Sequence, residues 1–174
     1  MANPDRAYGF KPWGPLLAVK HLQKDASAAA FGINDVVLQT TDGYVDVAGA
    51  AGTISNSVGV SLEYAATGSI GRVMCAIDPG QMLQAQDDGA GGAFAVTEIG
   101  TTGDSTFTTL NTTTNISTQE LDTSTLNASG VNQFLLIDIL VSDNVDGTTN
   151  ALGANVDCVL NWAAHRRGSS TVGV

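Results

Sequence analysis

Histidine is the side chain that most often completes a catalytic site at neutral pH, and this chain has two, His21 and His165. His21 lies in a basic segment near the N-terminus, and His165 lies beside Arg166 and Arg167. A catalytic triad needs a histidine held between a nucleophile and an acid, and no GxSxG, HExxH or phosphate-loop motif accompanies either one. The sequence therefore predicts a protein that is not an enzyme.

Carboxylates offer the next candidate chemistry. Asp87 and Asp88 are adjacent and could act as a catalytic pair, but we interpret them as a solvated strand end. The loop 143–147 is rich in oxygen ligands, yet it does not follow EF-hand spacing and is interpreted as a turn. The glycine-rich run 89–92 lacks the lysine and the helix of a phosphate loop. No metal and no cofactor are predicted.

The two cysteines, Cys75 and Cys158, follow neither CxxC nor metal-ligand spacing. Each lies in an apolar run that is typical of a strand. We favour buried thiols that pack as small hydrophobic groups over a disulfide, although the sequence alone leaves the pairing open.

Charge is distributed unevenly along the 174 residues, whose formal net charge is −10. Residues 1–24 contain four basic side chains and one acid, whereas residues 25–165 contain Arg72 and sixteen acids. Binding a phosphate backbone requires clustered Lys and Arg, so nucleic acid is not an expected partner. No apolar run fits a signal peptide or a transmembrane helix, so a membrane is not expected either, and we expect synthesis in a cytoplasm.

The first fifteen residues combine aromatic, basic and proline residues in a short span. Their prolines exclude a helix or a central strand, which predicts an extended arm. Aromatic and arginine side chains dominate interface energies, so we favour an arm that docks outward on a partner. Packing of the arm on its own body or on a neighbouring protomer is the alternative. The residues predicted to contact the partner are Arg6, Tyr8, Phe10, Lys11 and Trp13.

After the arm, short apolar runs separated by turn residues predict a series of β-strands. The expected strands lie at 36–38, 44–47, 58–64, 72–77, 81–86, 93–99, 133–142 and 156–162. Asp42-Gly43, between the first two, predicts a hairpin turn. With no long helix, the pattern indicates an all-β fold: a single antiparallel β-barrel or sandwich of about eight or nine short strands with an extended N-terminal arm.

Two stretches carry more specific expectations. Residues 100–130 are rich in Thr, Ser and Asn, which predicts a long ordered excursion with at most one helical turn near 117–121. The run 133–142 is almost continuously apolar, which predicts a strand buried on both faces, with a partner needed for Asp138.

The length is that of one ordinary domain. We divide it into a basic arm and lead-in at 1–24, an acidic β-domain at 25–165 and a short polar tail at 166–174.

Four stretches of the sequence, taken in order, follow a known pattern. The opening MANPDRAYGFKP resembles the MAN-x-D-x-x-x-G-F-x-P start of small structural proteins of tailed bacteriophages. The blocks GVSLEY at 59–64, VMCAIDPGQMLQAQDD at 73–88 and VLNWAAH at 159–165 resemble those of head decoration, or cement, proteins of these phages. In the second block, Met82 or Leu83 stands where the pattern usually has an aromatic residue.

The resemblance implies a non-catalytic virion protein on the outer capsid surface. It would bind the major capsid protein, bridge neighbouring subunits and so stabilise the shell, with the arm as its docking element. It also implies self-association, as a homotrimer or a dimer. Two alternatives remain open: a carbohydrate-binding or adhesive β-domain displayed on a virion, and a tail or neck subunit.

Overall fold

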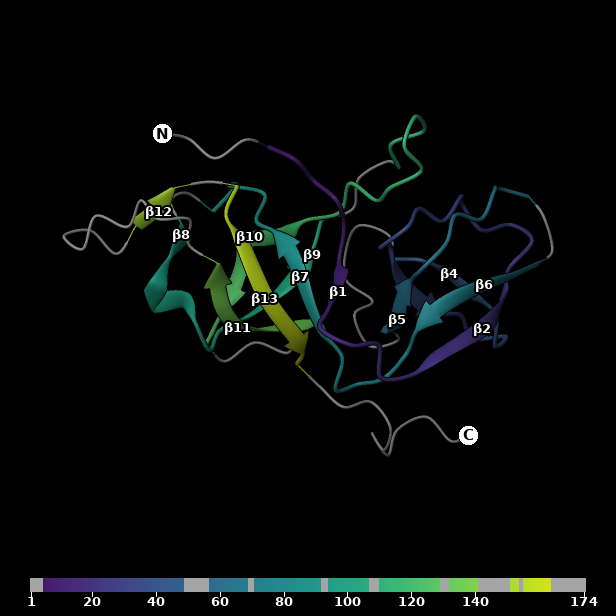
Figure 1. Cartoon of the computed structure of the whole chain (residues 1–174), viewed down its shortest axis with the longest axis horizontal. Helices are drawn as coiled ribbons and strands as arrows, with labels where there is room; N and C mark the ends of the chain where they lie inside the picture. Colours follow the sequence, from purple (N-terminus) through teal and green to yellow (C-terminus); the bar gives the residue numbers. More distant parts are fainter. Residues whose placement is uncertain are drawn as a thin grey trace.

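The computed structural model describes residues 5–48, 57–68, 71–91, 94–106, 110–128, 132–140, 151–153 (backbone only) and 155–163. The fold is all-β, as the sequence predicts, and its strands form two lobes that lie side by side (Figure 1). One lobe is a closed barrel. The other is a six-stranded sheet with a two-stranded sheet beyond it.

The barrel closes five strands in the order β2-β4-β3-β5-β6. Their bounds are β2 Val19–Lys24, β3 Val36–Gln39, β4 Val45–Val47, β5 Ser57–Ser61 and β6 Gly71–Ala76. Neighbouring strands are antiparallel except at the closure, where Lys24 of β2 lies beside Val45 of β4 in parallel register. Closure leaves no unpaired sheet edge to attract another strand.

The predicted hairpin turn at Asp42-Gly43 is confirmed. It joins β3 to β4, and the Thr40 N–H donates to the Tyr44 carbonyl at 2.9 Å. Gly43 has a φ of +87°, in the left-handed region that glycine enters without steric cost.

The six-stranded sheet has the order β1-β7-β13-β11-β9-β10 and is antiparallel throughout. Its strands are β1 Lys11–Trp13, β7 Met82–Gln86, β9 Thr102–Ser105, β10 Leu121–Asn127, β11 Phe134–Leu140 and β13 Asp157–Trp162. The two-stranded sheet pairs β8 Phe94–Ala95 with β12 Ala151–Gly153.

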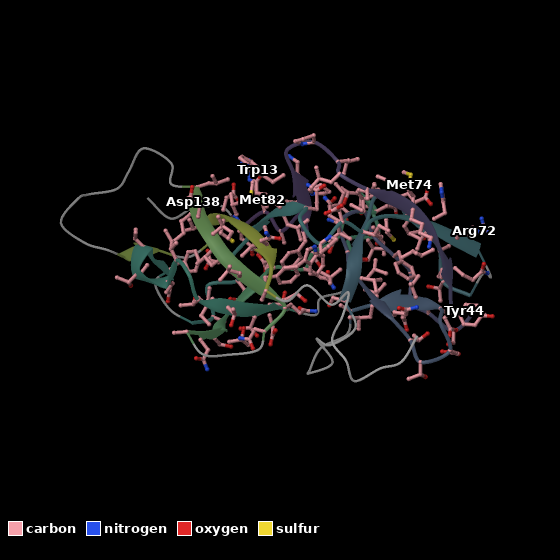
Figure 2. The ribbon with its side chains drawn as sticks, turned by 90° about the horizontal axis from the view of Figure 1, so that it is seen from below. Trp13, Tyr44, Arg72, Met74, Met82 and Asp138 are labelled. Atoms are coloured by element: carbon pink, nitrogen blue, oxygen red, sulfur yellow. The ribbon has the colours of Figure 1, made fainter. Side chains whose placement is uncertain are left out.

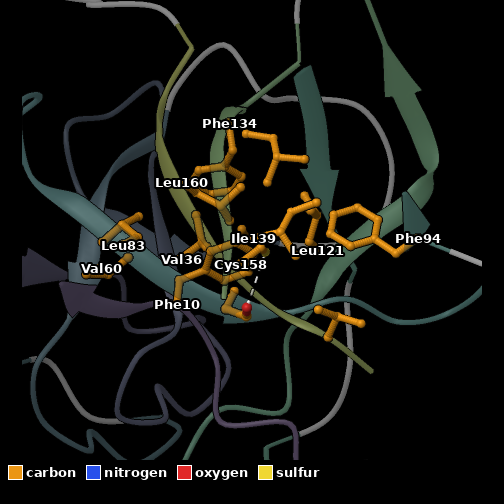
Figure 3. Packing of buried hydrophobic residues seen from close by; sticks show 14 of the residues in the cluster. Phe10, Val36, Val60, Leu83, Phe94, Leu121, Phe134, Ile139, Cys158 and Leu160 are labelled. Atoms are coloured by element: carbon orange, nitrogen blue, oxygen red, sulfur yellow. Dashed lines mark hydrogen bonds between the residues drawn. The ribbon is translucent and has the colours of Figure 1, made fainter. Parts of the chain in front are cut away.

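Buried apolar side chains form two clusters. One fills the barrel and contains Ala28, Phe31, Val37, Val45, Val73 and Cys75. The larger one lies between the barrel wall and the inner face of the sheet, and it includes Phe10, Val36, Val60, Leu83, Phe134 and Leu160 (Figure 3). Val36 and Val37 are both fully buried because successive strand residues face these two different clusters. A wall buried on both sides explains why the apolar runs here are continuous.

Two predictions for the middle of the chain are wrong. The strand expected at 93–99 contains only β8, which the 3-10 helix Val96–Glu98 follows. The excursion expected at 100–130 supplies the strands β9 and β10, which the sequence does not predict, while the absence of a helical turn at 117–121 agrees with the expectation of at most one. Threonine is a good strand former, so these strands form without the apolar alternation that would reveal them in the sequence.

The strand β11 is buried on one face only, contrary to the prediction. The register shifts between Leu136 and Asp138, and this β-bulge lets Ile137 and Asp138 both project outward. Both are exposed, Ile137 to 39%. The Asp138 carboxylate accepts a hydrogen bond from the Ile139 N–H at 2.8 Å, and its exposure removes the need for a buried partner.

The expected boundary at residue 24 does not divide the structure. β1 is an edge strand of the six-stranded sheet, and β2 is a wall of the barrel. Both lie within the predicted arm and lead-in, which is one reason why the described chain has thirteen strands, more than the sequence predicts. The predicted tail at 166–174 lies outside the described residues.

Candidate partner-binding surface

Two of the five predicted contact residues belong to the protein's own packing. Phe10 is fully buried, and its ring stacks on Phe134 with centroids 4.5 Å apart. The Tyr8 hydroxyl donates to the Asp157 carboxylate at 2.9 Å. Burial and then this hydrogen bond raise the pKa of Tyr8. An outward-docking arm is therefore the wrong description of these two residues, because Phe10 gains its burial within the chain.

The other three predicted contact residues, Arg6, Lys11 and Trp13, are exposed, Trp13 to 38%. The backbone around them is held in place, because the Arg6 N–H donates to the Gln86 side chain at 2.8 Å and β1 pairs with β7. Their contact with a partner stays a prediction.

The most exposed large apolar side chains of the described residues come directly after β1. Leu17 is 55% exposed, Leu16 is 50% exposed and Val19 is 44% exposed. We call residues 14–20 the leucine segment. It connects the sheet to the barrel, and it begins at Gly14, whose φ of +80° turns the chain out of β1.

A buried glutamine fixes the leucine segment to the body. Gln81 is 1% exposed, and its side-chain amide donates to the Trp13 carbonyl at 3.1 Å. Its carbonyl oxygen accepts from the Leu17 N–H, also at 3.1 Å. A third bond runs from the Ile77 N–H to the Ala18 carbonyl at 3.0 Å. The two leucines are thus presented on an ordered backbone, which reduces the entropy lost when a partner binds.

Two lysines lie close in the sequence to these apolar side chains. Lys11 and Lys20 are exposed, and neither forms an ion pair with another residue in the part of the chain that the structure describes. Lys24 does not belong to this surface, because it is 1% exposed and donates to the Ala66 carbonyl inside the barrel lobe. Desolvation lowers the pKa of Lys24.

Asp87 and Asp88, the adjacent carboxylates predicted to form a solvated strand end, directly follow β7 in the sheet. That interpretation is wrong for Asp87, which is 0% exposed and accepts hydrogen bonds from the N–H groups of Val156 and Gly89. Asp88 accepts from the hydroxyl of Thr123 at 2.9 Å. Both carboxylates therefore hold loop and strand backbone together, since Asp88 also accepts from the N–H groups of Ala90 and Thr123.

Glu120 adds a further carboxylate to this end of the sheet. Its Oε1 atom is buried and has no hydrogen-bond partner among the described residues. Burial and then the charges of Asp5, Asp88 and Asp87 raise the pKa of Glu120 to about 7. Burial likewise raises the pKa of Asp87 to about 6, with Glu98 among the contributing charges.

These shifts predict that the fold is more stable in mild acid. A carboxyl group whose pKa is higher in the folded state takes up a proton on folding, so its stability contribution is lost as pH rises from about 4.5 to 7. Replacing Glu120 with Gln should therefore stabilise the protein at pH 8 by about 1 kcal/mol, a value reduced for solvent screening.

Thermal melts at pH 8 and pH 5 measure this effect. The melting temperature of Glu120→Gln should exceed that of the wild type at pH 8, and the difference should shrink at pH 5. Asp42→Asn, at the exposed hairpin turn, is the matched control and should change little at either pH. A lower melting temperature for Glu120→Gln at pH 8 would contradict the assignment.

The remaining chemical candidates are spread over the structure. His21 is exposed on β2, whereas His165 and the loop 143–147 lie outside the described residues. Within the described ranges, no group of three His, Cys, Asp or Glu side chains is arranged to hold a metal ion. No helix in the described part of the chain is long and apolar enough to cross a bilayer.

The prediction of buried thiols is confirmed. Cys75 and Cys158 are both free and fully buried, Cys75 inside the barrel and Cys158 beneath the sheet. Burial raises the pKa of Cys75 to about 12 and also raises that of Cys158. Both thiols are therefore protonated at neutral pH, which makes them poor nucleophiles.

Comparison of the chain with protein-family models, curated proteins and solved structures found no match. The candidate surface therefore depends on the residues and their geometry alone.

Three parts of the surface are not evident from sequence reasoning: Leu16 and Leu17, the exposed Met82 beside Trp13, and the buried Gln81. The adjacent leucines between Pro15 and Ala18 carry a weak signal, because a pair of leucines beside a proline cannot both face one core from a regular strand. Nothing in the sequence signals that Gln81 holds the segment, since its partners lie far away in the chain.

Proposed function

We propose that this chain is a non-catalytic structural protein of a tailed-bacteriophage virion. It binds the outer surface of the capsid and stabilises the shell by bridging neighbouring major capsid subunits. The four stretches that resemble head decoration proteins support this proposal. The acidic body supports an outward location, because it is repelled by packaged DNA.

The leucine segment is the observation that carries the proposal. It exposes two leucines and a valine on an ordered backbone, in the basic N-terminal part of a chain whose net charge is −10. Apolar side chains held in fixed positions are what an interface needs for affinity, since burial of such groups drives association. Many copies on one shell would compensate for modest affinity at each site.

The proposal is tested by mixing the purified chain with expanded shells of the virus that encodes it, prepared without the chain. We expect copies over the whole shell, located by a reconstruction of the particle and counted by quantitative electrophoresis. Copies only at the tail vertex would indicate a neck or tail subunit instead. Failure to bind shells, together with selective binding on a glycan array, would favour the adhesive alternative.

The double variant Leu16→Ser/Leu17→Ser tests the leucine segment. Each leucine is about half exposed, so its burial contributes about 1 kcal/mol, and the pair should weaken shell binding at least tenfold. The matched control is Val96→Ser/Ile99→Ser, which replaces two similarly exposed side chains at the 3-10 helix and should bind normally. Wild-type binding by the leucine variant would remove this segment from the proposal without affecting the virion role.

A further inference from the structure

The outer face of the six-stranded sheet is defined by its register. Pro12, Leu83, Leu160 and Leu136 form one row across β1, β7, β13 and β11, and its three leucines are buried on the inner face. The next row consists of Lys11, Gln84, Val159 and Asp138. Since neighbours along a strand point to opposite sides, this second row lies on the outer face. We call the outer surface of these four strands the outer sheet face.

Exposed apolar side chains lie at both ends of the outer sheet face. Trp13 of β1 pairs with Met82 of β7, and each is 38% exposed. On β11, the bulge turns Ile137 outward next to Asp138, and Ile137 is 39% exposed. Figure 2 shows Trp13, Met82 and Asp138 together on one side of the molecule. The face thus carries three partly exposed apolar side chains around Val159, which is only 4% exposed.

The charges at the two ends of the outer sheet face are opposite. Lys11 lies on the edge strand β1, and Asp138 lies in the same row on β11. Three strand spacings separate them, or about 14 Å. Both side chains are exposed, and neither forms an ion pair within the described part of the chain.

The outer sheet face is complementary to the same face of a second copy. A two-fold axis parallel to the strands, between β7 and β13, brings Lys11 of each copy opposite Asp138 of the other. The same rotation brings Trp13 of each copy over the part of β11 that contains Leu135 in the other, next to the bulge where Ile137 projects. Two sheets packed face to face with their strands nearly aligned are a common arrangement. A two-fold contact uses the same surface on both partners, as this geometry requires.

We propose that the outer sheet face binds a second copy of this chain and forms a two-fold dimer. Two symmetric Lys11–Asp138 pairs fix the register, and the apolar groups supply the affinity. Charge complementarity between Lys11 and Asp138 favours this occupant, while Asp157, the other acid on this face, accepts a hydrogen bond from Tyr8 of its own chain. The proposal does not depend on the capsid role, since the residues that form this interface, Lys11, Trp13, Met82, Ile137 and Asp138, all lie outside the leucine segment.

The experiment is a charge exchange followed by sedimentation equilibrium of the full chain. Lys11→Asp places two acids opposite each other twice in the dimer, and Asp138→Lys does the same with two lysines. Each single variant should raise the dimer dissociation constant at least tenfold. An equimolar mixture of the two should form a heterodimer with nearly wild-type affinity, because both pairs are then again of opposite charge.

Sedimentation equilibrium is also the measurement for the control variants. Lys20→Asp on β2 and Asp42→Lys at the hairpin turn make equivalent charge changes away from the outer sheet face and should leave dimerisation unchanged. Melting temperatures confirm that every variant folds. A wild-type chain that stays monomeric, a trimer, insensitivity to both single variants, or a mixture that fails to recover affinity would each overturn the proposal.

Discussion

Replacing Phe10 with alanine will lower the free energy of unfolding by about 3 to 5 kcal/mol, a large share of the stability of a domain this size. The side chain is 0% exposed and stacks on Phe134, so its removal leaves a cavity between the barrel and the sheet. Urea denaturation measures the effect as a fall in the midpoint at nearly constant slope.

Trp13 provides the matched aromatic control for Phe10. It lies three residues away on the same segment but is 38% exposed, so Trp13→Ala should cost about 1 kcal/mol or less. If Phe10→Ala leaves unfolding unchanged and removes only partner binding, Phe10 is a docking residue and its packing against Phe134 is not significant. By the same reasoning, deletion of the first fifteen residues is expected to unfold the chain, and so it cannot serve as a docking test.

Gly9→Ala should destabilise the fold by about 3 kcal/mol or more, by a different mechanism. Gly9 has a φ of +75°, which costs other residues about 1 to 2 kcal/mol. An added Cβ would also lie 2.5 Å from the Asn34 carbonyl oxygen and 2.4 Å from the Ser117 Cβ. Neither backbone nor a buried serine can yield cheaply, so the N-terminal segment would have to move away from the barrel.

A substitution at Gly14 separates the cost of the left-handed backbone from the cost of the close contact at Gly9. Its φ of +80° is almost the same, but an added Cβ would meet nothing within 4 Å. Gly14→Ala should therefore show only the cost of the left-handed conformation, measured in the same denaturation experiment. Equal effects at both glycines would mean that the close approach at Gly9 is unimportant.

The sequence predicts most of the fold, where its signals are local. The Asp42-Gly43 turn, the apolar runs of β6, β7 and β13, and the all-β class follow from residue types within a few positions. β9 and β10 are hidden, because their threonines favour a strand without marking a buried face. The bulge in β11 is also hidden, since an inserted residue in an apolar run looks like continuous burial.

The candidate surface is less predictable, because it depends on which aromatic side chain is buried. Phe10 and Trp13 have the same local context of basic and proline residues, yet one enters the core and the other remains exposed. The difference is set by Phe134, which lies far along the chain, and by Gln81, which donates to the Trp13 carbonyl at the end of β1. No local pattern contains that information.

The stacking of Phe10 on Phe134 also determines when the chain can complete its fold during translation. The N-terminal segment leaves the ribosome first, but its partner strands β7 and β11 follow later, and β7 itself pairs with β13 near the C-terminal end of the described chain. Phe10 therefore has no stacking partner until β11 has been synthesised. Such distant pairings make folding slow and extend the time during which apolar side chains can associate with other chains.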